Sequence, residues 1–202
     1  MSRTPLLWPS ILTPSEEASE VKALYAQLTG VEYSVKAWEA ALLLYRTAAS
    51  PPSAIPREVA SRWRWIACNE CVFEIYHLRS RLQKIQSVQL HRCPSLRPWI
   101  DVSVIRRARK QLDEYFPDIE ALRHATAHRG ENEAHPEAHA PDGRIALTGF
   151  REPDRYSAPY LGKLCSLDIT DKSLDRIAEV VGTYLGAFEP AAKELERQGY
   201  LE

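Results

Sequence analysis

The sequence predicts an all-α protein: an antiparallel bundle of five or six helices, with a small β-hairpin inserted before the last helix. Three observations support this fold class. Residues 57–91 contain neither glycine nor proline, which leaves room for a helix of about 50 Å at about 1.5 Å per residue. Apolar residues recur at helical spacing before and after this stretch. The pattern becomes strand-like only between residues 145 and 170.

Prolines and glycines divide the first part of the chain. Residues 1–13 form an apolar arm, and a helix opens at Pro14, where proline and the two glutamates that follow suit the first turn. We expect this helix to end just before Gly30. A second amphipathic helix then covers residues 31–49, because its apolar residues recur at a spacing of three or four.

Aspartates mark the helix starts in the middle of the chain. Asp101 is placed to cap a helix that ends at Pro117, and Asp118 is placed to cap the short helix that follows. An aspartate at this position accepts hydrogen bonds from the free N–H groups of the first turn.

The last part of the chain changes character. Glycine, proline, histidine and acidic residues fill a loop at 130–144, and short β-like runs follow at 145–149 and 164–170. We expect these runs to form a hairpin that packs beside the bundle. Asp171 then caps a final helix through about residue 195.

Composition limits the classes of protein. The chain has 202 residues, 45% of them hydrophobic, and a formal net charge of -1. These values predict one globular domain over residues 1–202, with the loop and hairpin at 131–170 as an insertion. No apolar run reaches the 18 residues that a membrane span needs, and the N-terminus has no apolar core typical of a signal peptide. We therefore expect a cytoplasmic protein without a membrane partner.

Four cysteines occur, and Cys68 and Cys71 form a C-x-x-C pair within the long predicted helix. Such a pair is a cue for zinc or redox chemistry. Cys93 and Cys165 belong to no second pair, so the sequence favours buried free thiols that act as small apolar side chains.

The segment Leu122–Gly130 combines an arginine and two histidines near a helix end. Arg123 carries a fixed charge whose planar fork suits a phosphate. Histidine is a side chain that commonly accepts and donates protons in catalysis, which makes His128 a candidate to move a proton. Residues five apart on a helix differ by about 140° in direction, so Arg123 and His128 do not share one face. Either residue alone also has a structural interpretation, as a surface charge or as a cation near a helix C-terminus.

The run Arg123-His124-Ala-Thr-Ala-His128 resembles the motif of the HEPN superfamily (higher eukaryotes and prokaryotes nucleotide-binding), in which a histidine follows an arginine after four to six residues. The wider context from Tyr115 also resembles bacterial members. In the family the residue after the arginine is polar and often asparagine, whereas here it is His124.

The resemblance implies a small α-helical bundle that acts as a metal-independent endoribonuclease, without a cofactor. It implies a homodimer, in which two copies of the motif line one cleft and Arg123 and His128 are catalytic. The resemblance is also compatible with a toxin or defence component that has an antitoxin partner. The alternative is a non-catalytic HEPN-like module that binds RNA, a nucleotide or a protein.

A metal site competes with this interpretation. His124 and His128 have the spacing of two ligands on one helix face, and His135 and His139 follow in the loop. The segment lacks the glutamate of an H-E-x-x-H motif, so the prediction is no dedicated metal site.

Basic residues are concentrated in the middle of the chain. From Arg62 to Lys110 there are 11 Lys or Arg and three Asp or Glu, whereas residues 131–202 are acidic. This asymmetry favours binding to a polyanion such as RNA. The simpler alternative is that the basic residues lie on a helix face that is exposed to solvent and binds nothing. The densest group is the candidate for contacts to an RNA backbone: Arg106, Arg107, Arg109 and Lys110.

Polar residues interrupt the apolar pattern of the long helix. Glu70, Glu74 and His77 are candidates to support the motif, with Arg123 as a partner, or to form an unrelated polar network. Tyr156 and Tyr160, between the two expected strands, are candidates to stack on a base, and the loop at 131–143 is a candidate lid. The alternative is that these tyrosines cover the bundle.

Overall fold

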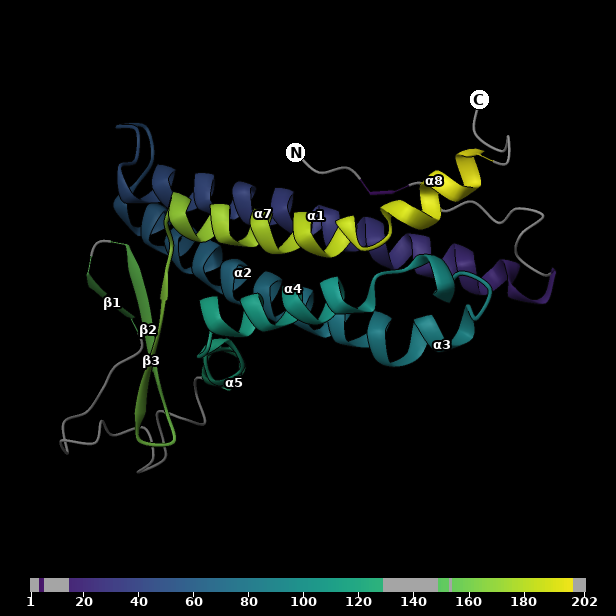
Figure 1. Cartoon of the computed structure of the whole chain (residues 1–202). Coiled ribbons are helices and arrows are strands. Elements are labelled where there is room, and N and C mark those ends of the chain that lie inside the picture. Colours follow the sequence, from purple (N-terminus) through teal and green to yellow (C-terminus); the bar gives the residue numbers. More distant parts are fainter. Residues whose placement is uncertain (1–3, 6–14, 129–148, 153, 198–202) are drawn as a thin grey trace. The chain divides into compact units, whose positions relative to one another are not determined.

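The computed structural model describes residues 4–5, 15–128, 149–152 and 154–197, and it confirms the predicted fold class. The chain is mostly helical, with a small antiparallel sheet before the last helices (Figure 1). The helices are α1 (Ala18–Ala49), α2 (Arg57–Lys84), α3 (Leu90–Arg92), α4 (Val102–Tyr115), α5 (Ile119–Ala127), α7 (Asp171–Gly186) and α8 (Glu189–Arg197). The strands are β1 (Gly149–Glu152), β2 (Arg155–Tyr160) and β3 (Lys163–Asp168).

The residues fall into two compact units, each built from separate stretches of chain. Unit 1 comprises residues 1–36, 77–115 and 176–202, and unit 2 comprises residues 37–76 and 116–175. The helices α1, α2 and α7 contribute residues to both units. Among the described helices, none has the length and apolar character needed to cross a membrane.

The expected helix end before Gly30 is wrong, because α1 runs without interruption from Ala18 to Ala49. Glycine inside a helix costs only about 1 kcal/mol relative to alanine. Leu28 and Val31, on either side of Gly30, are both fully buried, so their burial offsets that cost. Arg81 also stabilises α1 around Gly30, because its Nη1 donates to the Gly30 carbonyl at 3.2 Å and to Ser34 Oγ at 2.8 Å.

The long helix predicted from the absence of glycine and proline is confirmed. α2 extends to Lys84, and helical structure continues through a π-helical turn at Ile85–Gln89 into α3. Gln89 in this turn is buried, and its amide donates to the backbone and the carboxylate of Glu20, each at 3.0 Å.

Unit 1 has an apolar core with polar contacts at the helix ends. The Tyr184 hydroxyl donates to the Leu82 carbonyl at 3.3 Å within this core. Asp101 caps α4 as expected, because its Oδ1 accepts from the backbone N–H groups of Ser103 at 2.9 Å and Val104 at 3.2 Å. The Ser103 hydroxyl and these two amides lower the pKa of Asp101.

Unit 2 contains a three-stranded antiparallel sheet in the order β1-β2-β3. The expected strand at 164–170 is confirmed by β3, and the expected partner at 145–149 lies almost entirely outside the described residues. The strand that pairs with β3 is β2, with Arg155 opposite Asp168 and Tyr160 opposite Lys163. The hairpin is therefore one strand larger than expected.

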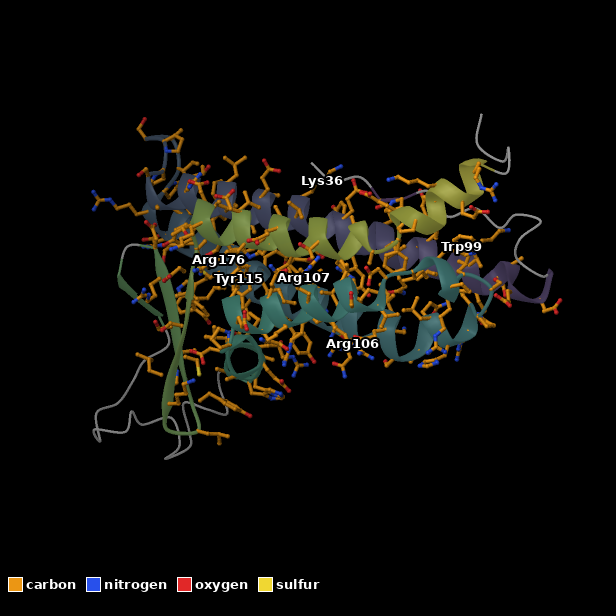
Figure 2. The ribbon with its side chains drawn as sticks, in the orientation of Figure 1. Lys36, Trp99, Arg106, Arg107, Tyr115 and Arg176 are labelled. Atoms are coloured by element: carbon orange, nitrogen blue, oxygen red, sulfur yellow. The ribbon has the colours of Figure 1, made fainter. Side chains whose placement is uncertain are left out.

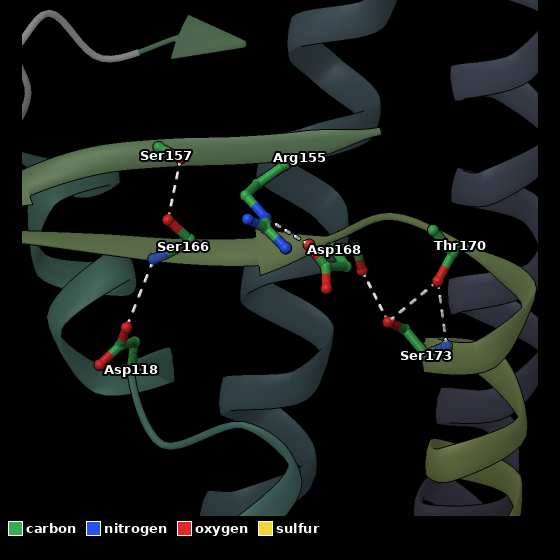
Figure 3. A network of polar contacts seen from close by, with 7 residues as sticks. All are labelled: Asp118, Arg155, Ser157, Ser166, Asp168, Thr170 and Ser173. Carbon is green, nitrogen blue, oxygen red and sulfur yellow. Dashed lines mark hydrogen bonds and ion pairs between the residues drawn. The ribbon is translucent and has the colours of Figure 1, made fainter. Parts of the chain in front are cut away.

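The start of α7 differs from the expectation in its cap. α7 begins at Asp171, so the capping position belongs to Thr170, whose Oγ1 accepts from the Ser173 N–H at 3.4 Å. Asp171 instead forms an ion pair with Arg46. The Ser173 hydroxyl donates to the Asp168 carbonyl at 2.7 Å and ties the helix start to the end of β3 (Figure 3).

Candidate functional site

The helix α5 carries the Arg–His motif and belongs to unit 2. Its buried face consists of Ile119, Leu122 and Ala125, which are spaced at three residues along the helix. Packing of this face leaves the polar residues of the motif at the side and at the C-terminal end. We call Arg123, His124 and His128 the α5 cluster.

Arg123 is half-buried, and its charged group contacts two side chains. The guanidinium carbon lies 5.1 Å from the ring centroid of Tyr76 on α2, a cation–π geometry. Nη1 lies 3.4 Å from Nδ1 of His124. Because an arginine can only donate, this contact requires the tautomer of His124 with its proton on Nε2. The arginine is therefore oriented by Tyr76 and in turn orients His124.

The ring of His124 lies between two other rings. The centroids of His124 and Tyr160 are 5.6 Å apart with an interplanar angle of 18°, and those of His124 and His128 are 6.4 Å apart with an angle of 19°. His128 is exposed at the C-terminal end of α5, where its backbone N–H donates to the His124 carbonyl at 3.0 Å. Arg123 and His128 point in directions about 140° apart around the helix, so they do not meet directly. His124 contacts both residues and thus links them.

The sheet holds α5 near its C-terminal end. α5 packs against β2 and β3, and the hydroxyls of Thr126 and Tyr156 are hydrogen-bonded at 3.1 Å. Tyr156 is 1% exposed and contacts the ring of Trp65 edge-on at 6.0 Å. Tyr156 is therefore a core residue and not a surface for stacking on a base. Tyr160 is half-buried and contacts the α5 cluster, so the expected position of the sheet next to the motif is confirmed.

Asp118 holds the sheet at the other end of α5. Asp118 occupies the capping position, but its side chain makes no capping hydrogen bond, contrary to the expectation. Its backbone φ and ψ of -93° and 1° differ from the extended conformation of an ordinary cap. Oδ1 instead accepts from Lys163 Nζ at 2.6 Å, and Oδ2 from the Ser166 N–H at 3.4 Å; Figure 3 shows the second contact. The hydrogen bond with Asp118 raises the pKa of Lys163.

The three supporting residues predicted on the long helix are distributed over both units. Glu70 and Glu74 belong to unit 2, and His77 belongs to unit 1. Glu70 and His77 are exposed, so they do not face the interior, whereas Glu74 is half-buried. The aromatic partner of Arg123 on α2 is Tyr76, which is not among the residues predicted from the sequence.

The predicted backbone-binding residues lie on α4 in unit 1. Figure 2 labels Arg106 and Arg107, which are exposed and form no hydrogen bond or ion pair with other described residues. Arg109 is half-buried and donates to Gln86, and Lys110 pairs with Glu114 at 3.4 Å. Arg106 and Arg107 are therefore the two members of the group whose charges are available to a bound anion.

An arginine–tyrosine contact of the same kind occurs in unit 1. The guanidinium of Arg176 lies 5.0 Å from the ring centroid of Tyr115, and both residues are labelled in Figure 2. The Tyr115 hydroxyl donates to Glu179 at 2.8 Å, and this carboxylate raises the pKa of Tyr115. The contact joins α4 to α7 within unit 1.

The cysteines behave as the sequence predicts, as buried free thiols. Burial raises the pKa of Cys68 to about 12 and that of Cys93 to about 11, and it also raises the pKa of Cys71 and Cys165. Within the described ranges there is no group of three or more His, Cys, Asp or Glu side chains that could hold a metal ion. His135 and His139 lie outside those ranges.

No family model matches this chain, and no match was found among curated proteins or solved structures. Function is therefore inferred from the residues of the chain themselves. The structure adds Tyr76 to the motif, and it places Tyr160, a candidate from the sequence, against His124. The sequence indicates Tyr76 only weakly: it is an aromatic residue on the long helix, and aromatic rings are common partners of arginine.

Proposed function

We propose that the protein is a HEPN-like, metal-independent endoribonuclease that acts as a homodimer. The observation that carries the proposal is the α5 cluster, in which Arg123 Nη1 lies 3.4 Å from His124 Nδ1 and the His124 ring stacks toward His128. A fixed cation and an exposed imidazole are thereby held in one small region. These are the groups that phosphodiester cleavage requires when no metal takes part.

The proposed reaction is transesterification followed by release of the product. His128 of one protomer removes the proton from a 2′-hydroxyl, and the 2′-oxygen attacks the adjacent phosphorus. The bond from phosphorus to the 5′-oxygen breaks, a protonated imidazole gives its proton to that oxygen, and a 2′,3′-cyclic phosphate remains. Arg123 stabilises the extra negative charge on the phosphate oxygens in the transition state.

The homodimer follows from the number of groups that the reaction needs. Two proton-transfer groups act on opposite sides of the phosphorus, whereas one protomer presents one exposed imidazole in its α5 cluster. A two-fold axis near α5 would supply the second imidazole from the partner. Light scattering should then show a dimer at micromolar concentration, and a stable monomer would count against the arrangement.

Arg106 and Arg107 are the proposed contacts to the RNA backbone. Both side chains are exposed, and neither forms a direct ion pair among the described residues, which suits them to a phosphate. The charge of Arg107 also helps to lower the pKa of Asp101. Replacing both with alanine should weaken RNA binding and reduce its dependence on salt. A variant with Lys22→Ala and Lys172→Ala is the matched control, since these lysines are also exposed.

The direct test of the proposed activity uses purified protein and labelled RNA in the presence of EDTA. Wild-type protein should leave products that end in a 2′,3′-cyclic phosphate, and His128→Ala should remove the activity. His91→Ala is the matched control, because His91 is also exposed near a helix end but lies on α3 in unit 1. Loss of cleavage in EDTA would refute the metal-independent mechanism.

A second candidate is a HEPN-like module that binds RNA, a nucleotide or a protein without cleaving it. The observation that favours it is that Tyr76 and His124 hold the Arg123 guanidinium in place. A fixed arginine can bind a phosphate without any proton transfer. RNA binding without cleavage over a range of substrates would select this candidate.

If the protein is an endoribonuclease, we propose that it serves as a toxin or a defence component and that an antitoxin is its partner.

A further inference from the structure

Tyr160 is the last residue of β2, and its half-buried ring stacks on the ring of His124 in the α5 cluster. The two centroids are 5.6 Å apart and the ring planes are inclined by 18°. The Tyr160 hydroxyl forms no hydrogen bond with another described side chain. The face of the ring, and not the hydroxyl, therefore makes the contact with the cluster.

The hairpin that carries Tyr160 is fixed to α5 at two further points. Lys163, which lies opposite Tyr160 in the β2–β3 ladder, donates to Asp118 at the start of α5 at 2.6 Å. Tyr156, on the same strand as Tyr160, is hydrogen-bonded to Thr126 near the end of α5 at 3.1 Å. All of these residues belong to unit 2. The stacked ring is thus held against α5 by contacts at both ends of that helix.

Stacking limits the orientations that the His124 ring can take. The second side-chain torsion of histidine is broad when nothing restrains it. A ring stacked on Tyr160 keeps one plane, which leaves two orientations that differ by a half-turn. The contact of Arg123 Nη1 with Nδ1 at 3.4 Å selects one of these two, because an arginine needs an acceptor. The fixed Nδ1 in turn gives the Arg123 guanidinium a fixed partner.

We propose that Tyr160 is a positioning residue, whose ring holds His124 and, through His124, the guanidinium of Arg123 that stabilises the transition state. The inference rests on the proposed ribonuclease function and adds a residue of the sheet to that site. A donor stabilises developing charge best when it is oriented before the reaction begins. Tyr160 does not touch the RNA in this arrangement, which separates its role from the base stacking expected from the sequence.

Steady-state cleavage of labelled RNA by the full chain in EDTA tests the proposal, because it measures kcat and KM separately. Tyr160→Phe retains the ring, whereas Tyr160→Leu removes the flat face and keeps an apolar side chain. Tyr25→Leu is the matched control, since Tyr25 is also half-buried but lies on α1 in unit 1. Assays are run well below the melting temperature of each variant. Tyr160→Val, which suits a strand, is the second variant if Tyr160→Leu does not fold.

We expect Tyr160→Leu to lower kcat by about 10–100-fold with little change in KM, as a small displacement of a catalytic group does. Tyr160→Phe and Tyr25→Leu should both retain the wild-type kcat. A rise in KM with unchanged kcat would show that the ring binds RNA directly and would overturn the positioning role. Wild-type values of both constants in Tyr160→Leu would also overturn it and leave the proposed function standing.

A double-mutant cycle with His124 tests whether Tyr160 acts through that residue. His124→Asn keeps a polar side chain but removes the ring on which Tyr160 stacks. In the His124→Asn background, Tyr160→Leu should therefore cause little further loss of kcat. The same fold-loss of kcat in both backgrounds would overturn the inference. Absence of cleavage by the wild-type protein would overturn the proposed function and this inference together.

Discussion

The ring of Tyr160 stacks on the ring of His124, with the two centroids 5.6 Å apart and the ring planes inclined by 18°. This contact connects the last residue of β2 to the middle of α5. It means that the sheet is part of the environment of the α5 cluster and that a change in β2 reaches His124 directly. Arg123 of the cluster also contacts Tyr76 on α2, and His124 stacks on His128 within the cluster.

Arg123 and His128 should respond differently to replacement by alanine. His128→Ala should leave the melting temperature nearly unchanged because the side chain is exposed. Arg123→Ala should destabilise the protein by about 0.5–1 kcal/mol, since it removes the cation–π contact with Tyr76. Thermal melts followed by circular dichroism measure both changes, with Arg62→Ala as the control for an exposed arginine. A steep loss of stability in His128→Ala would indicate a structural role for that histidine.

Gly30→Ala should stabilise the protein by about 0.5–1 kcal/mol, because alanine is the better residue in a helix interior. A Cβ atom at this position would meet Arg81 Nε at 3.5 Å, which is an ordinary contact distance. The expected change in melting temperature is an increase of about 1–4 °C for a chain of this size. A decrease would mean that α1 does not continue through residue 30 in solution.

Asp101→Ala should lower the stability of the protein, because the backbone N–H groups of Ser103 and Val104 lose their acceptor. The pKa of Asp101 is lowered in the folded protein, so its carboxylate contributes stability above the unfolded-state pKa of about 3.9. That contribution is lost as the pH falls through the lower, folded-state pKa. The difference in melting temperature between wild type and Asp101→Ala should therefore shrink in acid. Asp101→Asn, which retains capping, should be less destabilising at neutral pH.

The four thiols should be unreactive in the folded protein. Burial raises the pKa of all four cysteines, so very little thiolate is present near pH 8, and the sulfur atoms are also covered. Titration with Ellman's reagent should detect almost no thiol in native protein and all four after unfolding in guanidinium. Rapid reaction of one thiol in the native state would show that the segment around that cysteine opens. Added zinc should not raise the melting temperature if the cysteines bind no metal.

The features that could be predicted from the sequence are those with a local physical cause. Residues 57–91 contain no helix-breaking residue, and the long helix followed from that absence. Asp101 stands directly before a helical pattern, and the cap followed from its chemistry. The free, buried thiols of Cys68 and Cys71 followed from their place within a predicted helix and from the lack of a second C-x-x-C pair. Each of these depends on neighbours in the chain and on little else.

The features that were missed depend on distant residues. β2 has a run of four buried residues and contains Pro159, so it shows neither the alternation of a half-buried strand nor the composition of a central one. Within the described residues, the partners of β1 on this strand are Arg155, Tyr156 and Ser157, which all precede the proline. The contact of Tyr160 with His124 likewise exists only after β2 has paired with β3 and packed against α5.

The division of the described residues into two units has a practical consequence for dissecting the protein. Unit 1 is assembled from three separate stretches and unit 2 from two, and the boundaries at residues 36, 76 and 175 fall inside helices α1, α2 and α7. No single truncation isolates either unit, and a cut at residue 115 or 116 would leave both incomplete. Fragment expression is consequently a poor way to assign an activity to the α5 cluster, and point variants in the intact chain are required.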